Sequence, residues 1–309
     1  MVRGALQLES VLGAGKVAVV TGASSGIGKA MAAKFLSMAM TTYMVDVDEK
    51  ELRAATEELG KLGTAVAVVA DVADAAAMES VAARVFEEKK ACHVLCNNAG
   101  TGKGGGPLSA VETFQKTLAV NAFGPVNGCV AFVPRMKASG EPGLVVNTGS
   151  KQGITAPPGN AVYNVSKSAL KTYTEALEHE LRSTTDNLAA ALLIPGWVNT
   201  SIMLKSKRDQ ALEAGADFDP DSVFFHEHKP QKGAWMPSQV VDFMLDELKK
   251  GRFYICCPDN DVTRTVDNAR MTWAMQDITQ DRPPLSRWHP DWKEPFNAFL
   301  AKETGGESA

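Results

Sequence analysis

The chain has 309 residues, of which 45% are hydrophobic and 22% are charged, and its formal net charge is -4. This balance argues against nucleic acid or an anionic membrane as partners. No uninterrupted apolar run approaches the roughly 18 residues of a membrane-spanning helix, and residues 1–15 lack the apolar core of a signal peptide. The five cysteines form no CxxC pair, which favours a reduced, cytoplasmic protein.

The first predicted strand is the apolar run Val17–Val20, which reads as a strand buried on both faces of a parallel sheet. Thr-Gly-Ala-Ser-Ser-Gly-Ile-Gly follows, and Gly28 is expected to open a helix that runs to about Met38. Glycine allows a tight turn, a close backbone approach to a pyrophosphate and close packing of helix on strand. The N–H groups at the helix start would face the ligand's negative charge. In this context the motif predicts a dinucleotide site.

A second strand is predicted at Thr41–Asp46 and ends in a carboxylate. Asp46 follows Gly22 at about the interval at which a Rossmann unit places an acid on the adenosine ribose. Alternatively, Asp46 only caps the next helix, expected over Asp48–Leu62. An acid on the ribose would repel a 2′-phosphate, and neither Ser25 nor Val47, the neighbours from which a basic side chain could hold that phosphate, is Lys or Arg. Lys29 is the only nearby cation, and it lies one helical step further on. The pattern therefore favours NAD over NADP.

Two more strands are predicted at Ala65–Ala70 and His93–Cys96, with a helix over about residues 74–89 between them. Asp71 follows the first of these strands at the same edge of the sheet, where it can reach the adenine amino group. The second strand runs into Asn-Asn-Ala-Gly at 97–100. Its asparagines can bridge neighbouring loops, and its glycine leaves room for the nicotinamide ribose. Taken alone, this tetrapeptide would equally suit an ordinary turn.

These motifs, in this order, resemble the short-chain dehydrogenase/reductase family from Gly15 to about Thr200. The resemblance implies an NAD- or NADP-dependent oxidoreductase with an asparagine on the next helix and then a serine, a tyrosine and a lysine. The chain supplies them as Asn121, Ser150, Tyr163 and Lys167. Ser150 follows the strand Gly143–Thr148 and precedes Tyr163 by the family's usual interval.

The four residues also make chemical sense together. Tyr163 and Lys167 lie one helical turn apart and project from one face of the helix expected over Val162–Arg182. Tyrosine, with an ordinary pKa of about 10, is a poor base near neutrality, but a nearby ammonium favours the phenolate. Ser150 can hold the substrate oxygen beside Tyr163. The alternative is a surface Tyr–Lys pair with an unrelated serine and asparagine.

Asn121 lies on a helix that also contains Gly124 and Pro125. Pro125 has no N–H to bond to the carbonyl of Asn121. The family resemblance implies that this asparagine holds a water linking the lysine to solvent, and a freed carbonyl would suit that role.

The resemblance assigns a larger set of residues to the cofactor. A strand at Leu188–Ile194 leads into the turn Pro195–Thr200, which would pass the nicotinamide carboxamide. The expected cofactor-binding residues are Gly22, Ser24, Ser25, Gly26, Ile27, Gly28, Asp46, Val47, Asp71, Val72, Asn98, Ala99, Gly100, Thr148, Tyr163, Lys167, Pro195, Gly196, Val198 and Thr200.

Residues 201–237 contain few periodic apolar positions and many turn formers, which indicates a lid over the substrate. His226 and His228 have no supporting acid or cysteine pattern, so no metal site is expected there. Three aromatic residues could form an apolar wall of the substrate pocket or pack beneath the loop; they are Trp197, Phe224 and Phe225.

A helix at Ser238–Lys250 and a strand at Phe253–Cys257 complete the expected sheet. The sequence thus predicts an α/β fold of Rossmann type: a doubly wound parallel sheet of about seven strands in three α/β/α layers. We expect a single domain over residues 1–309, with a core at about 15–258 and a C-terminal tail at 259–309.

The tail should begin with a helix at Asp259–Asp277. The prolines at 283, 284 and 290 then exclude one continuous helix. We expect this part to run extended over the pocket or onto a neighbouring subunit, burying Trp288 and Trp292.

The predicted activity is the NAD-dependent interconversion of a secondary alcohol and a ketone, with Tyr163 exchanging the proton. An NADP-dependent carbonyl reductase is one alternative. A protein that senses NAD(H) without turnover is another, although it would not need the four residues. The resemblance also implies a homodimer or homotetramer. The helix at 162–182 carries small residues that would let two copies approach, unless they pack within one subunit: Val165, Ala169, Thr172, Ala176 and His179.

Overall fold

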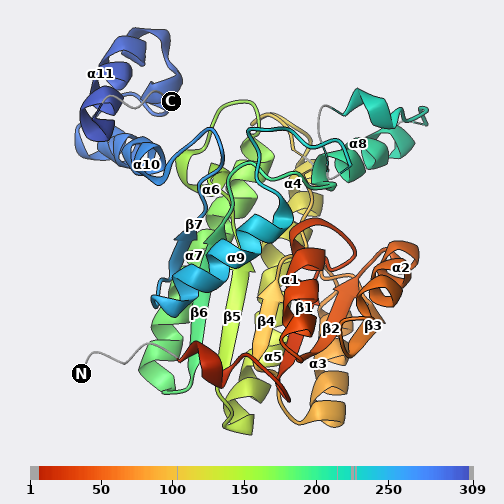
Figure 1. Cartoon of the computed structure of the whole chain (residues 1–309). Coiled ribbons are helices and arrows are strands. Elements are labelled where there is room, and N and C mark those ends of the chain that lie inside the picture. The colour runs from red at the N-terminus through yellow and green to blue at the C-terminus, as the bar shows by residue number, and fades with distance from the viewer. Residues whose placement is uncertain (1–6, 103, 214, 224–225, 227, 306–309) are drawn as a thin grey trace.

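A sheet of seven parallel strands forms the middle layer of the protein (Figure 1), in the order β3-β2-β1-β4-β5-β6-β7. The computed structural model describes residues 7–305 except 103, 214, 224, 225 and 227. The strands are β1 (Val17–Thr21), β2 (Thr41–Asp46), β3 (Ala65–Val69), β4 (Val94–Asn97), β5 (Gly143–Thr148), β6 (Leu188–Ile194) and β7 (Tyr254–Cys256). The prediction of a doubly wound parallel sheet is confirmed.

Helices cover both faces of the sheet (Figure 1). Alternate strand residues point to opposite faces, so Ala18 and Val20 enter one core while Val17 and Val19 enter the other. This double burial explains why the strands are apolar throughout. The first face carries α1 (Gly26–Ser37), α2 (Glu49–Leu59) and α9 (Pro237–Lys249), and the second carries α3 (Ala75–Lys89), α5 (Gly124–Ser139) and α7 (Ala161–Thr184).

The strand order reverses between β1 and β4, which are neighbours in the sheet although two strands separate them in sequence. The chain leaves β1 toward one face and leaves β4 toward the other. The loops that follow these two strands therefore diverge and open a crevice at the carboxyl edge of the sheet, where ligands bind in folds of this kind.

One helical stretch contains a distortion beside this crevice. It consists of α4 (Val111–Leu118), a π-helical turn η2 (Ala119–Phe123) and α5 in unbroken succession. Residues 111–139 are long and apolar enough to span a membrane, the one such stretch among the described residues. More than half of its most apolar window is buried in the protein, because α5 packs against the sheet and α3. Residues 111–139 therefore have the burial of a core helix.

The segment expected to be an irregular lid contains a helix, α8 (Ile202–Glu213). Its apolar residues do not recur at helical spacing, so periodicity gave no signal for it. A short helix that was not expected, α6 (Gln152–Thr155), follows Ser150. Short 3₁₀ turns occur at η1 (Leu8–Ser10) and η3 (Pro220–Ser222). Phe224 and Phe225 lie outside the described residues, so their expected place in the substrate wall cannot be assigned.

The tail is a helical hairpin, and the expectation of an extended segment was wrong (Figure 1). It consists of α10 (Arg264–Thr279), the 3₁₀ turns η4 (Ser286–Trp288) and η5 (Pro290–Trp292), and α11 (Lys293–Thr304). Pro290 occupies the first turn of η5, where proline costs no hydrogen bond. Prolines therefore separate the helical elements without unwinding them.

A tryptophan other than the two expected ones forms the centre of the tail. Trp273 is only 4% exposed, and its indole N–H donates to Ser286 Oγ at 2.8 Å. The rings of Trp292, Phe296 and Phe299 pack around it. Trp288 is 43% exposed in the single chain, so the expectation that the tail buries it is not met within one subunit.

The tail is attached to the body beside the turn that carries Ser150. Lys151 Nζ lies 2.5 Å from Asp267 Oδ2 and 3.4 Å from Asp259 Oδ2. Asp259 also accepts hydrogen bonds from Val262 N and Trp197 N. The helix predicted to begin at Asp259 therefore begins later, at Arg264, where Thr263 provides the cap.

Candidate active site

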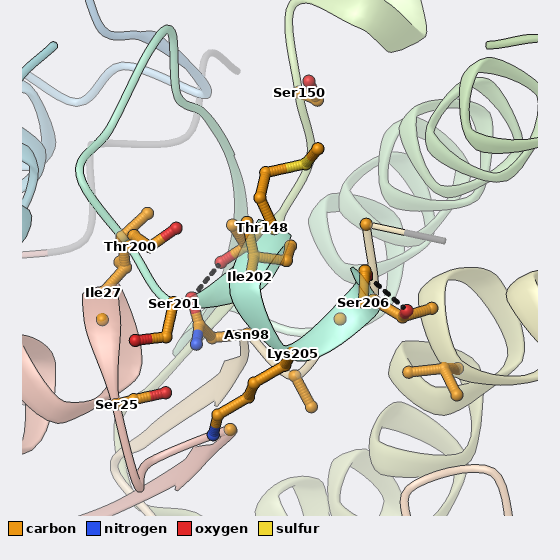
Figure 2. A pocket seen from close by; sticks show the side chains of 18 of the residues that line it. Ser25, Ile27, Asn98, Thr148, Ser150, Thr200, Ser201, Ile202, Lys205 and Ser206 are labelled. Carbon is orange, nitrogen blue, oxygen red and sulfur yellow. Dashed lines mark hydrogen bonds between the residues drawn. The ribbon is translucent and has the colours of Figure 1, made fainter. Parts of the chain in front are cut away.

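A cavity of about 850 Å³ lies at the carboxyl edge of the sheet, between the glycine-rich turn, α7 and α8 (Figure 2). It is lined by Ser150, Trp197 and eighteen of the expected cofactor-binding residues. Ser24 and Gly28, which are buried behind this lining, complete the expected set. The lining residues are Gly22, Ser25, Gly26, Ile27, Asp46, Val47, Asp71, Val72, Asn98, Ala99, Gly100, Thr148, Tyr163, Lys167, Pro195, Gly196, Val198 and Thr200.

The glycine-rich turn has the close contacts that its sequence predicted. A Cβ on Gly28 would lie 2.1 Å from the carbonyl oxygen of Gly22, and one on Gly22 would lie 2.8 Å from Ala99 Cα. Gly22 and Gly26 also have positive φ angles, +66° and +54°. Ser25, the N-cap of α1, makes no side-chain capping hydrogen bond, so the start of this helix faces the cavity as an anion site should.

Asp46 ends β2, which β1 and β4 separate from the strand before Ser150, and it does not cap α2. Its Oδ2 accepts from Ser24 N at 3.0 Å and its Oδ1 accepts from Asp48 N at 3.1 Å. Asp48 is the residue that caps α2, accepting from Glu51 N at 3.0 Å. The capping alternative was therefore wrong. Lys29, the expected nearby cation, pairs with Glu58.

Asn98 connects the ends of three strands below the cavity. Its Nδ2 donates to the carbonyl oxygen of Thr21 at 3.2 Å, and its Oδ1 accepts from Thr148 Oγ1 at 3.2 Å (Figure 2). The predicted bridging between neighbouring loops is confirmed. A Cβ on Gly100 would lie 3.7 Å from Lys167 Nζ and 3.3 Å from Asn121 Oδ1, so glycine keeps the space above the lysine open.

Ser150, Tyr163 and Lys167 meet at one wall of the cavity. Lys167 is 4% exposed, and its Nζ donates to the carbonyl oxygen of Thr148 at 2.8 Å. The same Nζ lies 5.8 Å from the centre of the Tyr163 ring, and Ser150 hydrogen-bonds the tyrosine hydroxyl. The arrangement brings together a proton donor, a second hydroxyl and a buried cation.

Burial shifts the pKa values of two side chains in this wall. It raises the pKa of Tyr163, and the hydrogen bond from Ser150 opposes that shift. Burial also lowers the pKa of Lys167 to about 8. The sequence analysis expected the ammonium to lower the tyrosine pKa. In this structure burial has the larger effect, and the tyrosine pKa is raised.

Asn121 lies in the π-helical turn and is fully buried. Its Oδ1 accepts from Thr101 N at 2.8 Å. Its Nδ2 donates to the carbonyl oxygen of Thr101 at 3.0 Å and to Ser166 Oγ at 3.1 Å. The side chain therefore joins the loop after β4 to α7.

Sequence reasoning missed the residues that α8 contributes. Ile202, Met203 and Ser206 face the loop after β4, where a Cβ on Gly102 would contact all three. Lys205 and Arg208 also line the cavity. Helix propensity was the available signal, because Met, Leu, Lys and Arg at 203–208 all favour helix.

Gln152 was missed as well. It lies in α6, just after Ser150, and it lines the same cavity. Its Oε1 is buried and has no hydrogen-bond partner among the described residues. A buried polar atom of this kind is paired in nearly all proteins, so the cavity is built to receive a polar ligand.

No metal centre is seen in the part of the chain that the structure describes, where no three His, Cys, Asp or Glu side chains gather. His226 and His228 face each other, with ring centres 5.9 Å apart. All five cysteines are free and buried.

Comparisons with known proteins identify the family of the chain. The sequence profile of the short chain dehydrogenase family matches residues 16–211. A 1-deoxy-11-beta-hydroxypentalenate dehydrogenase of Streptomyces exfoliatus is 36% identical over 88% of this chain and 94% of its own length.

Two solved structures are each 30% identical to the chain. One is a short-chain dehydrogenase/reductase of Burkholderia phymatum in complex with NAD, with a TM-score of 0.77 over 89% of this chain and 97% of that one. The other is a metagenomic short-chain oxidoreductase in complex with NADP, with a TM-score of 0.56 over 69% of this chain and 96% of that one. The chain therefore belongs to the short-chain dehydrogenase family and is an oxidoreductase of that family.

Proposed function

We propose that the protein interconverts a secondary alcohol and a ketone with NAD as the hydride carrier. The observation that carries this proposal is the pair of hydroxyls on Ser150 and Tyr163. The pair lines the same cavity as Asp46, which ends β2, two intervening strands away from the strand before Ser150. A cavity that reaches across these strands suits an extended dinucleotide, and the family to which the chain belongs performs oxidoreduction.

Different residues of the chain would bind the cofactor and act on the substrate. The start of α1 and the glycine-rich turn would receive the pyrophosphate, and Asp46 would accept hydrogen bonds from the adenosine ribose. The nicotinamide, when bound, supplies or accepts the hydride. Ser150 would hold the substrate oxygen while Tyr163 gives it a proton as a ketone is reduced, or takes the proton as an alcohol is oxidised. Burial raises the pKa of Tyr163 above its ordinary value, which makes the phenolate harder to form and suits the reductive direction, in which the hydroxyl donates its proton.

The choice of NAD over NADP is supported by the charge of Asp46 at the ribose end. An NADP-dependent carbonyl reductase is the alternative, and one of the similar structures was solved with NADP. A protein that binds the dinucleotide without turnover is a second alternative. Such a protein would not need the buried Tyr163–Lys167 pair.

The surface of α7 supports a homodimer or homotetramer. The five small-residue positions expected on one face of this helix are all exposed in the single chain. This exposure favours assembly over the alternative that the face packs within its own subunit. Val130 of the neighbouring α5 is also exposed, by 66%, which adds apolar surface that a second copy would cover. We also propose that the tail folds as part of the same domain, held by Lys151.

Tyr163→Phe should lower kcat on a panel of secondary alcohols and ketones by at least about a hundredfold, the usual contribution of a positioned proton-transfer group. Binding of NADH, measured by calorimetry, should change little because the ring is kept. Wild-type turnover by the variant would contradict the mechanism. An inactive wild-type chain that binds NADH would favour the sensing alternative.

Lys167→Met should raise the midpoint of thermal unfolding at pH 7 while impairing turnover. Lys167 has a folded pKa of about 8, below the ordinary value of about 10.4. Holding its charge at pH 7 therefore costs ~3 kcal/mol. The lost hydrogen bond to Thr148 has a charged donor and offsets about 1.5–3 kcal/mol of this, so the rise should be small.

The stability gap should also depend on pH. Between pH 8 and about 10.4 the unfolded wild-type chain binds more protons than the folded chain. The wild type should therefore gain stability as pH rises, and the advantage of Lys167→Met should shrink. Thermal unfolding at pH 7 and pH 9.5 measures this, and a pH-independent gap would contradict it.

Asp46→Ala combined with Val47→Arg should shift cofactor preference toward NADP. The change removes a repelling charge and adds a phosphate partner at a position that is 66% exposed beside the cavity. NAD affinity should fall about tenfold or more, since hydrogen bonds to a charged group are worth about 1.5–3 kcal/mol.

Asp46→Asn is the matched control for this change, because it keeps an acceptor for Ser24 N and removes only the charge. Calorimetric dissociation constants for NAD and NADP give the preference. An unchanged ratio in the double variant would show that Asp46 only fixes the glycine-rich turn.

Light scattering should report a dimer or tetramer of the full chain, and unfolding should occur in one transition. A chain ending at Asn260 should unfold at a lower temperature. It loses Asp267 as the partner of Lys151, and it uncovers the cluster of Leu192 and Ile194 against which Met271 packs. A monomeric full chain would contradict the assembly, and an unchanged midpoint after truncation would contradict the single domain.

A further inference from the structure

Two cations of α8 reach the adenosine end of the cavity. Lys205 Nζ lies 3.2 Å from Ser24 Oγ and 2.5 Å from Glu51 Oε2. Arg208 Nη1 lies 3.9 Å from the other carboxylate oxygen of Glu51 and also lines the cavity. Figure 2 shows the Lys205 side chain running from α8 toward the turn that carries Ser25.

The position of Lys205 is fixed by its contact with Ser24. The backbone N–H of Ser24 donates to Asp46 Oδ2, while its hydroxyl contacts Lys205. The ammonium and the Asp46 carboxylate thus flank the same residue, which places Lys205 at the ribose end and away from Tyr163. Lys29 pairs with Glu58 and is not among the residues that line the cavity.

The charges around this end are unequal. Five carboxylates of the described residues line it or face it, and two cations oppose them. Arg208 is shared between Glu51 and Asp209, at 3.9 and 3.3 Å. Among the acids that the structure describes, Lys205 contacts only Glu51, and its side chain is 26% exposed. The carboxylates are those of Asp46, Asp48, Glu51, Asp71 and Asp209.

We propose that Lys205 is a specificity-determining residue that provides a partner for a 2′-phosphate on the adenosine ribose. The proposal rests on the dinucleotide function proposed above. A phosphate monoester carries a charge of about -1.5 to -2 at pH 7, so it competes with Glu51 for the ammonium. With NAD, Lys205 stays on Glu51 and ties α8 to α2. With NADP, Lys205 moves to the phosphate and offsets the repulsion by Asp46, so that NADP is disfavoured but still accepted.

The test compares NADH with NADPH, which differ only in the 2′-phosphate, by isothermal titration calorimetry. Lys205→Ala should weaken NADPH binding about tenfold, as for loss of one charge-assisted hydrogen bond. NADH binding should stay within about twofold. Lys205→Arg should restore most of the NADPH affinity because it restores the charge. Glu51→Gln should strengthen NADPH binding several-fold, because it removes the carboxylate that competes for Lys205.

Lys207→Ala is the matched control. Lys207 lies on the same helix, is exposed, and contacts the carbonyl oxygen of Ser222 at 3.4 Å, so neither ligand should be affected. Circular dichroism checks that each variant is folded. The 2′,5′-bisphosphate of adenosine, compared with 5′-AMP, should show the same selective loss.

Three results would overturn the proposal. Equal losses of NADH and NADPH affinity in Lys205→Ala would show a contact to the pyrophosphate instead. No loss of either would show that Lys205 only ties α8 to α2. Failure of the wild-type chain to bind either dinucleotide would overturn the dinucleotide site itself, which distinguishes that failure from the failure of this inference.

Discussion

The nucleotide cavity depends on how closely the first turn of α1 approaches the end of β1. The two meet at Gly22 and Gly28, where a single methyl group would lie 2.1 Å from a carbonyl oxygen. No side chain can be accommodated there unless the helix moves. Moving it would displace the backbone that carries Ser24, and with it the hydrogen bond that orients the Asp46 carboxylate. Asn98 holds β4 against the same strand end, so the crevice is set by packing before any ligand enters.

Much of this arrangement could be read from the sequence because it is local. The strands β5 and β6 begin and end at the predicted residues, since strands buried on both faces appear as uninterrupted apolar runs. The cofactor positions followed from turns whose residues are adjacent in sequence. The helix α8 could not be found from its apolar pattern, and the contact of Lys205 with Ser24 joins residues 181 positions apart. The prediction for the tail failed for a similar reason. Trp273 on α10 stabilises the fold of the tail by packing against the rings of Phe296 and Phe299 on α11.

The fold shifts the pKa values of Tyr163 and Lys167, the pair on α7. Burial raises the pKa of Tyr163 and lowers that of Lys167, so both groups are moved toward their neutral forms. The lysine is nevertheless held in place by the carbonyl oxygen of Thr148, at the end of a central strand. A site of this kind sacrifices stability for a defined proton position, as functional sites commonly do. Asn121 also helps to hold the lysine in place, because its side chain fixes the loop over Lys167.

The contact between Lys151 and the tail has a consequence for the cavity. The family profile ends at residue 211, within α8, and the tail lies beyond that boundary. Yet Asp259 and Asp267 of the tail region reach back to the residue next to Ser150, and Asp259 also binds the backbone of Trp197. Changes in the tail can therefore alter the surroundings of Ser150 and Trp197, which line the cavity, although the tail is far from them in sequence.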